Sequence, residues 1–259
     1  MTGRHLLILG GTGEAAALAR GALARFGESL AVTTALAGRT RHPGLLPGQV
    51  RIGGFGGAAG LAAYIIDHEV DRLIDATHPF AAEIARAARL AAERTGVARL
   101  VLLRPPWRRH ALDRWIEVDG IEAAATLVGR VGRRPLLTVG AGAVPAFSRA
   151  SELRFVVRLI DPPRGALPLP RYEVVLGRGP FSIVEERRLM QRHAIDVLVC
   201  KASGGAATEA KLIAARELGL PVIMVRRPPR EPGPAVETVE AALDWLAGLD
   251  RLPEARRMS

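Results

Sequence analysis

The chain has 259 residues, 49% of them hydrophobic, a profile that indicates a soluble globular protein and excludes a disordered one. Its apolar stretches fall well short of the roughly 20 residues that a membrane helix needs, and its first residues are expected to form a strand and not a signal peptide. The single cysteine, Cys200, excludes an internal disulfide framework. We therefore expect a cytoplasmic protein.

The formal charge of +10, from 36 basic and 26 acidic residues, favours an anionic partner. That partner is a nucleic acid, a phosphorylated cofactor or a substrate with several carboxylates. The basic residues are dispersed and only 4% of residues are aromatic, which argues against a nucleic-acid surface. A GC-rich genome that enriches arginine is the alternative explanation of the charge.

Apolar runs alternate with helical patterns, which predicts βα units and parallel sheets. In the first part of the chain the expected elements are, in order, strand His5–Leu9, helix Glu14–Phe26, strand Leu30–Leu36, helix Ala58–Asp67, strand Arg72–Ala76, helix Phe80–Arg94 and strand Arg99–Leu103.

Two prolines in Arg104-Pro105-Pro106-Trp107 interrupt this pattern, because proline does not fit a central strand. We place a domain boundary here, giving an N-terminal domain of residues 1–105 and a C-terminal domain of residues 106–259. In the second domain the expected elements are helix Ile121–Val131, strand Pro135–Val139, strand Leu153–Ile160, strand Tyr172–Leu176, helix Phe181–His193, strand Asp196–Cys200, helix Ala206–Leu218, strand Pro221–Val225 and helix Val236–Leu249.

A glycine turn, Gly10-Gly11-Thr12-Gly13, follows the first strand and opens the first helix. The pattern Gly11-x-Gly13-x-x-Ala16 matches the relaxed dinucleotide fingerprint, in which backbone N–H groups and a helix N-terminus hold the pyrophosphate. Such turns also serve flavins, other nucleotides or close packing alone.

The second expected strand ends at Leu36 and is followed by Gly38-Arg39-Thr40, with no carboxylate between Ser29 and Ile66. Enzymes that use NAD usually place a carboxylate here to hold the ribose 2′-hydroxyl. Arg39, by contrast, suits the 2′-phosphate of NADP. The pattern favours NADPH, unless Arg39 is a solvated loop residue.

Asp75-Ala76-Thr77-His78-Pro79 lies at the carboxyl end of the third of these strands, where α/β sheets bind ligands. His78 is a candidate for orienting a substrate or acting as an acid. The alternative is that Asp75 or Thr77 caps the next helix, with Pro79 in its first turn.

In the second half, Arg178-Gly179-Pro180-Phe181 and Lys201-Ala202-Ser203-Gly204-Gly205 each follow a strand and precede a helix. We expect both turns to present backbone N–H groups to an anion, on neighbouring strands that line one cleft. Cys200 is interpreted as a buried apolar residue and not a nucleophile. HExxH, P-loop and GxSxG patterns are absent, so metal-dependent and acyl-transfer chemistry are not expected, and no metal site is predicted.

Taken together, these segments resemble the precorrin-6A reductase family of cobalamin biosynthesis, almost over the full length. The segments that carry the resemblance are Leu9–Ala15, Ala37–Thr40, Gly53–Gly57, Asp75–Ala81, Arg104–Trp107, Arg178–Phe181, Lys201–Gly205 and Ala215–Val222. One position departs from the family, which more often has asparagine where this chain has Ala202.

The resemblance implies two Rossmann-like domains with parallel sheets flanked by helices, an active-site cleft between them, and NADPH-dependent reduction of precorrin-6A to precorrin-6B. From the residues themselves, we expect the cofactor-binding residues to be Gly10, Gly11, Thr12, Gly13, Gly38, Arg39, Thr40 and Thr77. The candidates for binding the substrate are Arg104, Arg108, Arg178, Gly179, Lys201, Ser203 and Gly204, and some of their basic side chains are expected to hold its carboxylates. The catalytic candidates are His78, Asp75 and Lys201, and the proton donor is His78, Lys201 or water.

The expected partner is a small polycarboxylate tetrapyrrole, without nucleic acid or membrane, and the chain is expected to be a monomer or a weak dimer. The alternatives are a cobalt-precorrin-6A reductase, a regulator that senses NADPH without catalysis, and a nucleic-acid binder.

Overall fold

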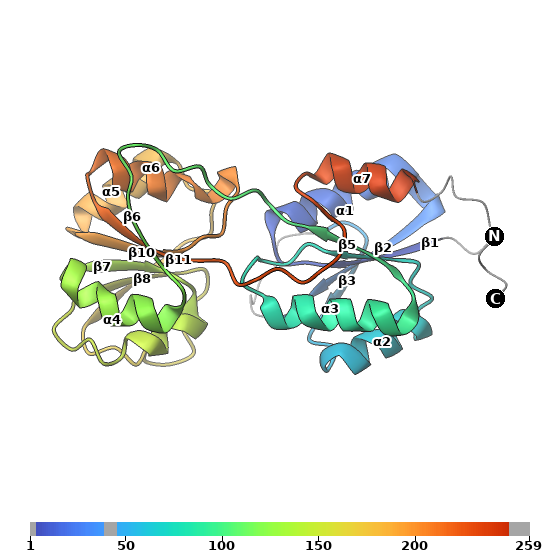
Figure 1. The fold of residues 1–259 in the computed structure, drawn as a ribbon, viewed down its shortest axis with the longest axis horizontal. Helices are drawn as coiled ribbons and strands as arrows, with labels where there is room; N and C mark the ends of the chain where they lie inside the picture. The colour runs from blue at the N-terminus through green and yellow to red at the C-terminus, as the bar shows by residue number, and fades with distance from the viewer. Residues whose placement is uncertain (1–3, 39–45, 249–259) are drawn as a thin grey trace. The chain divides into compact units, whose positions relative to one another are not determined.

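A computed structural model describes residues 4–38 and 46–248 of the chain. The chain forms two compact units, one built from the residues up to Arg104 together with those from Pro228 onward, and one from Pro105–Arg227. Each unit holds one parallel six-stranded sheet with helices on both faces (Figure 1). The predicted α/β class with two Rossmann-like domains is confirmed.

The sheet of the first unit has the strand order β12-β5-β4-β1-β2-β3. Its strands are β1 (Arg4–Leu9), β2 (Leu30–Leu36), β3 (Gln49–Ile52), β4 (Arg72–Asp75), β5 (Ala98–Leu102) and β12 (Ala235–Val236). Its helices are α1 (Gly13–Phe26), α2 (Gly57–Asp67), α3 (Ala82–Thr95) and α7 (Val239–Gly248). A short 3₁₀ turn, η1 (Gly27–Ser29), joins α1 to β2.

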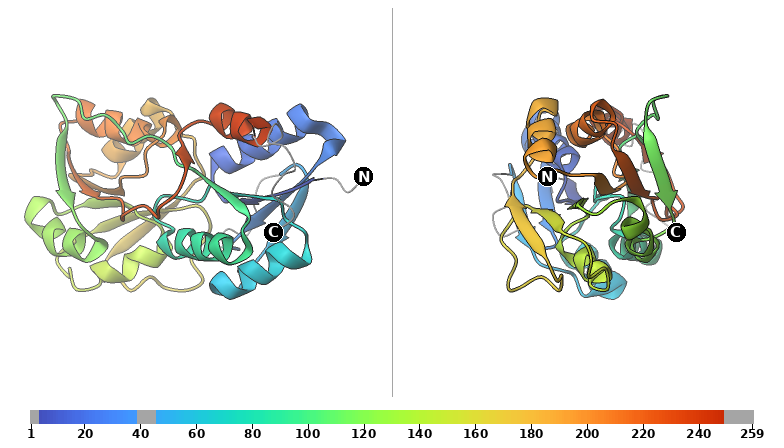
Figure 2. Two further views of the ribbon diagram at one scale, coloured as in Figure 1. Left: turned by 45° about the vertical axis from the view of Figure 1, so that its right-hand side comes forward. Right: turned by 90° about the vertical axis from the view of Figure 1, so that its left-hand side faces the viewer.

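Helices α1 and α7 pack side by side on one face of this sheet, and α2 and α3 pack together on the other (Figures 1 and 2). The central strand β1 has four consecutive buried residues, Leu6 to Leu9, whose side chains alternate between the two cores. Each of these four side chains contributes about 1.5–3 kcal/mol by burial. A continuously apolar strand is therefore explained by a sheet covered on both faces.

The sheet of the second unit has the order β6-β11-β10-β7-β8-β9. Its strands are β6 (Arg114–Val118), β7 (Pro135–Thr138), β8 (Phe155–Leu159), β9 (Tyr172–Leu176), β10 (Val197–Lys201) and β11 (Pro221–Val225). Its helical segments are α4 (Ile121–Val131), η2 (Ala141–Phe147), α5 (Ile183–Arg192), η3 (Ala206–Thr208) and α6 (Ala210–Glu217). Helices α5 and α6 pack together and cover one face, while α4 and η2 lie on the other (Figure 1).

The structure divides the chain differently from the expected consecutive domains, 1–105 and 106–259. The first crossing lies where the prolines indicated it, but the chain returns after Arg227, and β12 pairs with β5 in parallel. Conversely, β6 pairs with β11 in the second sheet. The physical reason is that β12 and α7 cover apolar surface of the first unit, where Ala242 and Leu246 join the core around α1.

Three strands were not predicted, namely β3, β6 and β12. The first two are exposed edge strands with charged residues and no continuous apolar run, and the third has two residues and follows a proline-rich loop. The expected end of the last helix, Leu249, lies outside the described residues. Within residues 4–38 and 46–248, no helix combines the length and the apolar character that crossing a membrane requires.

Candidate functional site

The glycine turn lies between the carboxyl end of β1 and the first turn of α1. The Gly10 N–H donates to the carbonyl oxygen of Ala35 on β2 at 2.9 Å, and a Cβ at Gly10 would contact the Thr34 methyl group at 2.8 Å. Gly11 has a φ of +106°, in the region that favours glycine. A Cβ at Gly11 or Gly13 would meet no heavy atom within 4 Å, so the space beside both α-carbons is open to a ligand.

Thr12 is the N-cap of α1 and connects the glycine turn to the end of β4. Its hydroxyl accepts from the Ala15 N–H at 3.1 Å and donates to the carbonyl oxygen of Ala76 at 2.8 Å. The remaining N–H groups of the first helical turn have no intrahelical acceptor, and the helix dipole gives this end positive potential. The turn therefore has the geometry and polarity that hold a dinucleotide pyrophosphate.

Asp75 ends β4 and is 3% exposed. Its carboxylate accepts from the Thr77 N–H at 3.1 Å and from the Thr77 hydroxyl at 2.7 Å. Burial raises the pKa of Asp75 above its ordinary value, and the hydrogen bonds from Thr77 and the charge of Arg99 oppose that shift. The next helix begins later, with Ala81 as its N-cap, so the alternative in which Asp75 or Thr77 caps it is wrong. Asp75 instead fixes the turn that carries Thr77.

His78 is half-buried in the segment that follows, and its Nδ1 accepts a hydrogen bond from the Phe80 N–H at 3.2 Å. The same residue's carbonyl oxygen accepts from the Ala81 N–H at 2.8 Å. With Nδ1 as an acceptor, the neutral ring carries its proton on Nε2. Nε2–H is therefore the group through which the neutral ring donates a hydrogen bond.

Behind Asp75 lies a group of charged residues that sequence reasoning missed. Arg99, on β5, is 8% exposed and donates to the carbonyl oxygen of Pro232, and burial lowers the pKa of its guanidinium. Arg89, on α3, pairs with Glu231 at 2.6 Å. These contacts attach residues 231–232, which precede β12, to the first unit. An arginine in the otherwise apolar expected strand Arg99–Leu103 was the available signal.

The carboxyl end of β2 lies beside that of β1 and continues into Gly38, whose φ is +70°. Arg39 and Thr40 lie outside the described residues. Arg51 lies in the same stretch without carboxylates. Its guanidinium is held by the turn after β3, where it donates to the Gly53 and Gly54 carbonyl oxygens at 2.6 and 3.1 Å. It also stacks on Phe55, with 4.0 Å between Cζ and the ring centroid.

Arg104, expected at the substrate, pairs with Glu14 at 3.2 Å in the first unit. Glu14 is in the first turn of α1, next to Gly13. A carboxylate there repels a pyrophosphate, and the guanidinium offsets that repulsion. The structure therefore brings Arg104 to the glycine turn. Arg108 is exposed on the loop of the second unit that precedes β6.

In the second unit, the turn Lys201–Gly205 follows β10. We expected the backbone N–H groups of this turn to face an anion, and that prediction is wrong for three of them, which donate to carbonyl oxygens instead. The Ala202 N–H donates to the Val225 carbonyl oxygen at 2.9 Å, that of Ser203 to Lys201 at 2.7 Å, and that of Gly205 to Pro105 at 3.2 Å. The Ser203 hydroxyl lies 3.3 Å from the Lys201 carbonyl oxygen. The Lys201 ammonium is thus the main anion-attracting group that the turn itself supplies.

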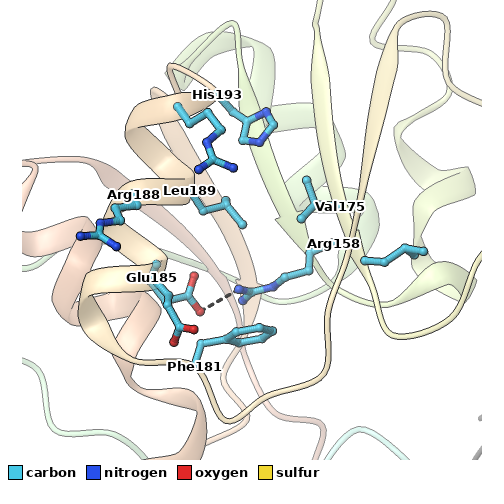
Figure 3. Close-up of a pocket in the computed structure, with 10 residues that line it drawn as sticks. Arg158, Val175, Phe181, Glu185, Arg188, Leu189 and His193 are labelled. Atoms are coloured by element: carbon cyan, nitrogen blue, oxygen red, sulfur yellow. Dashed lines mark hydrogen bonds and ion pairs between the residues drawn. The ribbon is translucent and has the colours of Figure 1, made fainter.

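The other turn, Arg178–Phe181, leads from β9 to α5 and begins beside a cavity of about 330 Å³ (Figure 3). Arg158 of β8 pairs with Glu186 of α5 at 2.7 Å, and its Cζ lies 4.5 Å from the centroid of the Phe181 ring. Glu186 is 3% exposed. A Cβ at Gly177 would contact the Phe181 ring at 2.9 Å. The ring is therefore held between Gly177 and Arg158, whereas Arg178 and Gly179 are exposed.

The two turns are not on neighbouring strands, as the sequence had suggested, because β7 and β8 lie between β10 and β9. Three strand spacings correspond to about 14 Å across the sheet. The error arose because β9 and β10 follow one another in the chain but lie on opposite sides of β7 in the sheet. Any single ligand that reaches both turns must be large.

Cys200 is fully buried in β10, and burial raises the pKa of its thiol to about 11. The thiolate is the nucleophilic form, so the interpretation of Cys200 as an apolar core residue is confirmed. Within the described part of the chain, no cluster of three or more histidine, cysteine, aspartate or glutamate side chains has the arrangement of a metal site.

Two parallel sheets, a glycine turn of the dinucleotide-binding type and basic loops at strand ends are typical of a Rossmann-like α/β enzyme. The family model described as Precorrin-6x reductase CbiJ/CobK matches residues 5–247, and the chain belongs to this family.

A precorrin-6A reductase of Rhodococcus erythropolis is 50% identical over 248 residues, covering 95% of this chain and 99% of that protein. A solved structure titled CobK precorrin-6A reductase has a TM-score of 0.90 at 42% identity, covering 97% of this chain and 99% of that one. A cobalt-precorrin-6A reductase of Priestia megaterium is 30% identical over 200 residues, covering 73% and 77% of the two chains.

Proposed function

We propose that this chain is a precorrin-6A reductase that uses NADPH to reduce one double bond of precorrin-6A, giving precorrin-6B in cobalamin biosynthesis. The observation that carries the assignment is the family match over residues 5–247, together with 50% identity to a precorrin-6A reductase along nearly the whole chain. The expected fold and the order of its motifs agree with this function.

The first unit is assigned to the cofactor. The open space at Gly11 and Gly13, the first turn of α1 and the Thr12 cap suit a pyrophosphate. The absence of any carboxylate from Ser29 to Ile66, with Arg39 just after β2, supports a 2′-phosphate and hence NADPH over NADH. Gly38 and Thr40 are assigned to the same phosphate loop, and Thr77 to the nicotinamide end. When bound, the cofactor supplies a hydride to one carbon of the substrate.

The second unit is assigned to the substrate carboxylates. Lys201 and Arg178 supply positive charge at the ends of two strands that lie about 14 Å apart across the sheet, a spacing that suits a macrocycle with several carboxylates at its rim. Arg108, Gly179 and Gly204 are assigned to the same function. Arg104 is assigned to neutralising Glu14 beside the pyrophosphate.

A proton must reach the carbon next to the one that receives the hydride. His78 Nε2 is assigned as its donor, because the Phe80 N–H holds Nδ1 as an acceptor and leaves the ring proton on Nε2; the proton that Nε2 gives up is replaced from water in the same step. Asp75 acts by fixing Thr77 and the start of that segment. The His78→Gln variant is expected to lower kcat at unchanged KM for NADPH. Unchanged kcat assigns the proton to Lys201 or water.

The test of the activity is to mix the protein with NADPH and precorrin-6A and to follow the loss of nicotinamide absorbance. Oxidation of NADPH only when precorrin-6A is present is the expected result. Binding of NADPH without substrate-dependent oxidation would instead identify a regulator. Parallel assays with cobalt-precorrin-6A test the cobalt-first route, which the more distant relationship to a cobalt-precorrin-6A reductase makes the second candidate.

The cofactor assignment has its own test. Arg39→Glu is expected to raise KM for NADPH far more than KM for NADH, because the new carboxylate repels the 2′-phosphate. Equal effects on both cofactors would refute the assignment of the 2′-phosphate to Arg39.

A further inference from the structure

The first and last residues of the second unit both contact the turn Lys201–Gly205. Arg227, the last residue, donates from Nε to the Ala202 carbonyl oxygen at 2.7 Å and from Nη2 to that of Ser203 at 2.9 Å. Pro105, the first residue, accepts from the Gly205 N–H at 3.2 Å. Residues far apart in the sequence thus hold one five-residue turn.

Trp107, two residues after Pro105, completes these contacts. Its indole Nε1–H donates to the Gly205 carbonyl oxygen at 2.8 Å, and its ring lies 5.0 Å from the buried ammonium of Lys211. Lys211 in turn donates to the carbonyl oxygen of Thr208 at 2.6 Å, directly after the turn. The carbonyl oxygens of Ala202, Ser203 and Gly205 therefore all accept hydrogen bonds from side chains near the two ends of the unit.

The turn is shaped to admit these contacts. Gly204 has a φ of +70°, and a Cβ there would lie 2.1 Å from Arg227 Nη2 and 2.2 Å from the Pro105 carbonyl oxygen. Any other residue at this position displaces the guanidinium or the proline. A planar guanidinium is required as well, because it donates to two carbonyl oxygens in a fixed fork that an ammonium lacks.

We propose that Arg227 and Trp107 are positioning residues for the reaction, which fix the turn so that Lys201 is held in place for a substrate carboxylate. Neither residue has to touch the substrate in this role. The proposal rests on the assignment of Lys201 to substrate binding, so the experiment measures the order of the turn and the binding of substrate separately.

The test compares full-length Arg227→Lys and Trp107→Phe with wild type. The first keeps the charge and loses the fork, and the second keeps a ring beside Lys211 and loses the indole donor. Arg226→Lys is the matched control, because Arg226 is exposed and pairs only with Glu117 and Asp119 among the described contacts.

Loss of charge-assisted hydrogen bonds in Arg227→Lys is expected to raise KM for precorrin-6A about tenfold and to leave KM for NADPH unchanged. Hydrogen exchange of the amides of Ala202, Ser203 and Gly205 is expected to accelerate in the same variant. Arg227→Ala, which removes the guanidinium altogether, is also expected to raise KM for precorrin-6A. Millimolar guanidinium in solution is expected to bring that KM part of the way back. Arg226→Lys is expected to match wild type in all of these measurements.

Two outcomes would overturn the proposal, and they differ. Unchanged amide exchange and unchanged KM in Arg227→Lys show that the turn does not depend on Arg227. Faster exchange in Arg227→Lys, with KM for precorrin-6A unchanged both there and in Lys201→Ala, shows that the turn is held but does not bind substrate. That second outcome refutes the assignment of Lys201 and leaves the reductase activity itself intact.

Discussion

The hydroxyl of Thr12 donates a hydrogen bond to the carbonyl oxygen of Ala76 at 2.8 Å, which joins two segments 64 residues apart. One is the glycine turn after β1, and the other leads to Thr77 and His78 after β4. The turn that we assign to the cofactor and the candidate proton donor therefore have a common support, and a change at Thr12 is expected to affect both.

Thr12→Val removes the N-cap of α1 and the bond to Ala76 with little change in volume. The free energy of unfolding is expected to fall by about 1–2 kcal/mol, the usual contribution of a cap, and KM for NADPH to rise. Chemical denaturation and steady-state kinetics measure the two effects. Thr12→Ser keeps both hydrogen bonds, so a loss of similar size in that variant would contradict this explanation.

Gly13→Ala separates stability from cofactor binding. Gly13 is the first residue of α1 and has open space where a Cβ would lie, so alanine is expected to stabilise the fold by about 0.5 kcal/mol. The same methyl group occupies space assigned to the pyrophosphate, so KM for NADPH is expected to rise. A variant that is more stable and binds NADPH as well as wild type would place the pyrophosphate elsewhere.

Asp75 predicts a specific dependence of stability on pH. Because burial raises its pKa in the folded state, the folded protein binds a proton more tightly than the unfolded chain, whose ordinary value is 3.8. The contribution of this group is fully present below pH 3.8 and is lost as pH rises through the folded pKa. Relative to Asp75→Asn, wild type is expected to lose stability between pH 3.8 and the folded pKa of Asp75. Above that pKa, the difference in free energy of unfolding between the two proteins is expected to stay constant. Urea denaturation from pH 3.5 to pH 8 measures the difference, and a wild type that instead gains stability relative to Asp75→Asn would contradict the direction of the shift.

Arg158 and Glu186 form a buried ion pair, with side chains 10% and 3% exposed. Arg158→Met leaves the Glu186 carboxylate buried without its partner and is expected to cost about 3 kcal/mol. In the double variant with Glu186→Gln, much of that loss is expected to be recovered. Arg187→Met is the matched control, because its pair with Glu217 is exposed and contributes less than about 1 kcal/mol. A double variant whose loss in free energy of unfolding equals the sum of the losses in the two single variants would refute the coupling.

The elements with strong local patterns were predicted almost to the residue. Strands Leu30–Leu36, Tyr172–Leu176 and Pro221–Val225 and helix Ile121–Val131 have the expected bounds, because apolar runs and flanking glycines or prolines define them locally. The edge strands β3, β6 and β12 lacked such runs. Pairing of β12 with β5 is a contact between distant segments, which local periodicity does not encode.

The candidate site divides in the same way. The glycine turn was predictable because a positive φ at Gly11 and a helix start leave a sequence pattern. The bond from Thr12 to Ala76 and the contacts of Arg227 depend on which strands become neighbours, so no local pattern indicated them. Charged residues inside apolar strands, such as Arg99 and Arg158, are the signal that deserved a structural explanation.

The hydrogen bond of 3.4 Å between Arg227 Nη2 and the Pro105 carbonyl oxygen brings together the two ends of residues 105–227. In the linear gene, this stretch is an insertion into the coding sequence of the first unit, and its ends meet in space as those of an inserted domain do. A short linker between the two ends would therefore suffice to make a circular permutant of the second unit. Because Pro105 and Arg227 lie side by side, a short linker could join their chain neighbours Arg104 and Pro228. The second unit could then be removed or exchanged as a single gene segment.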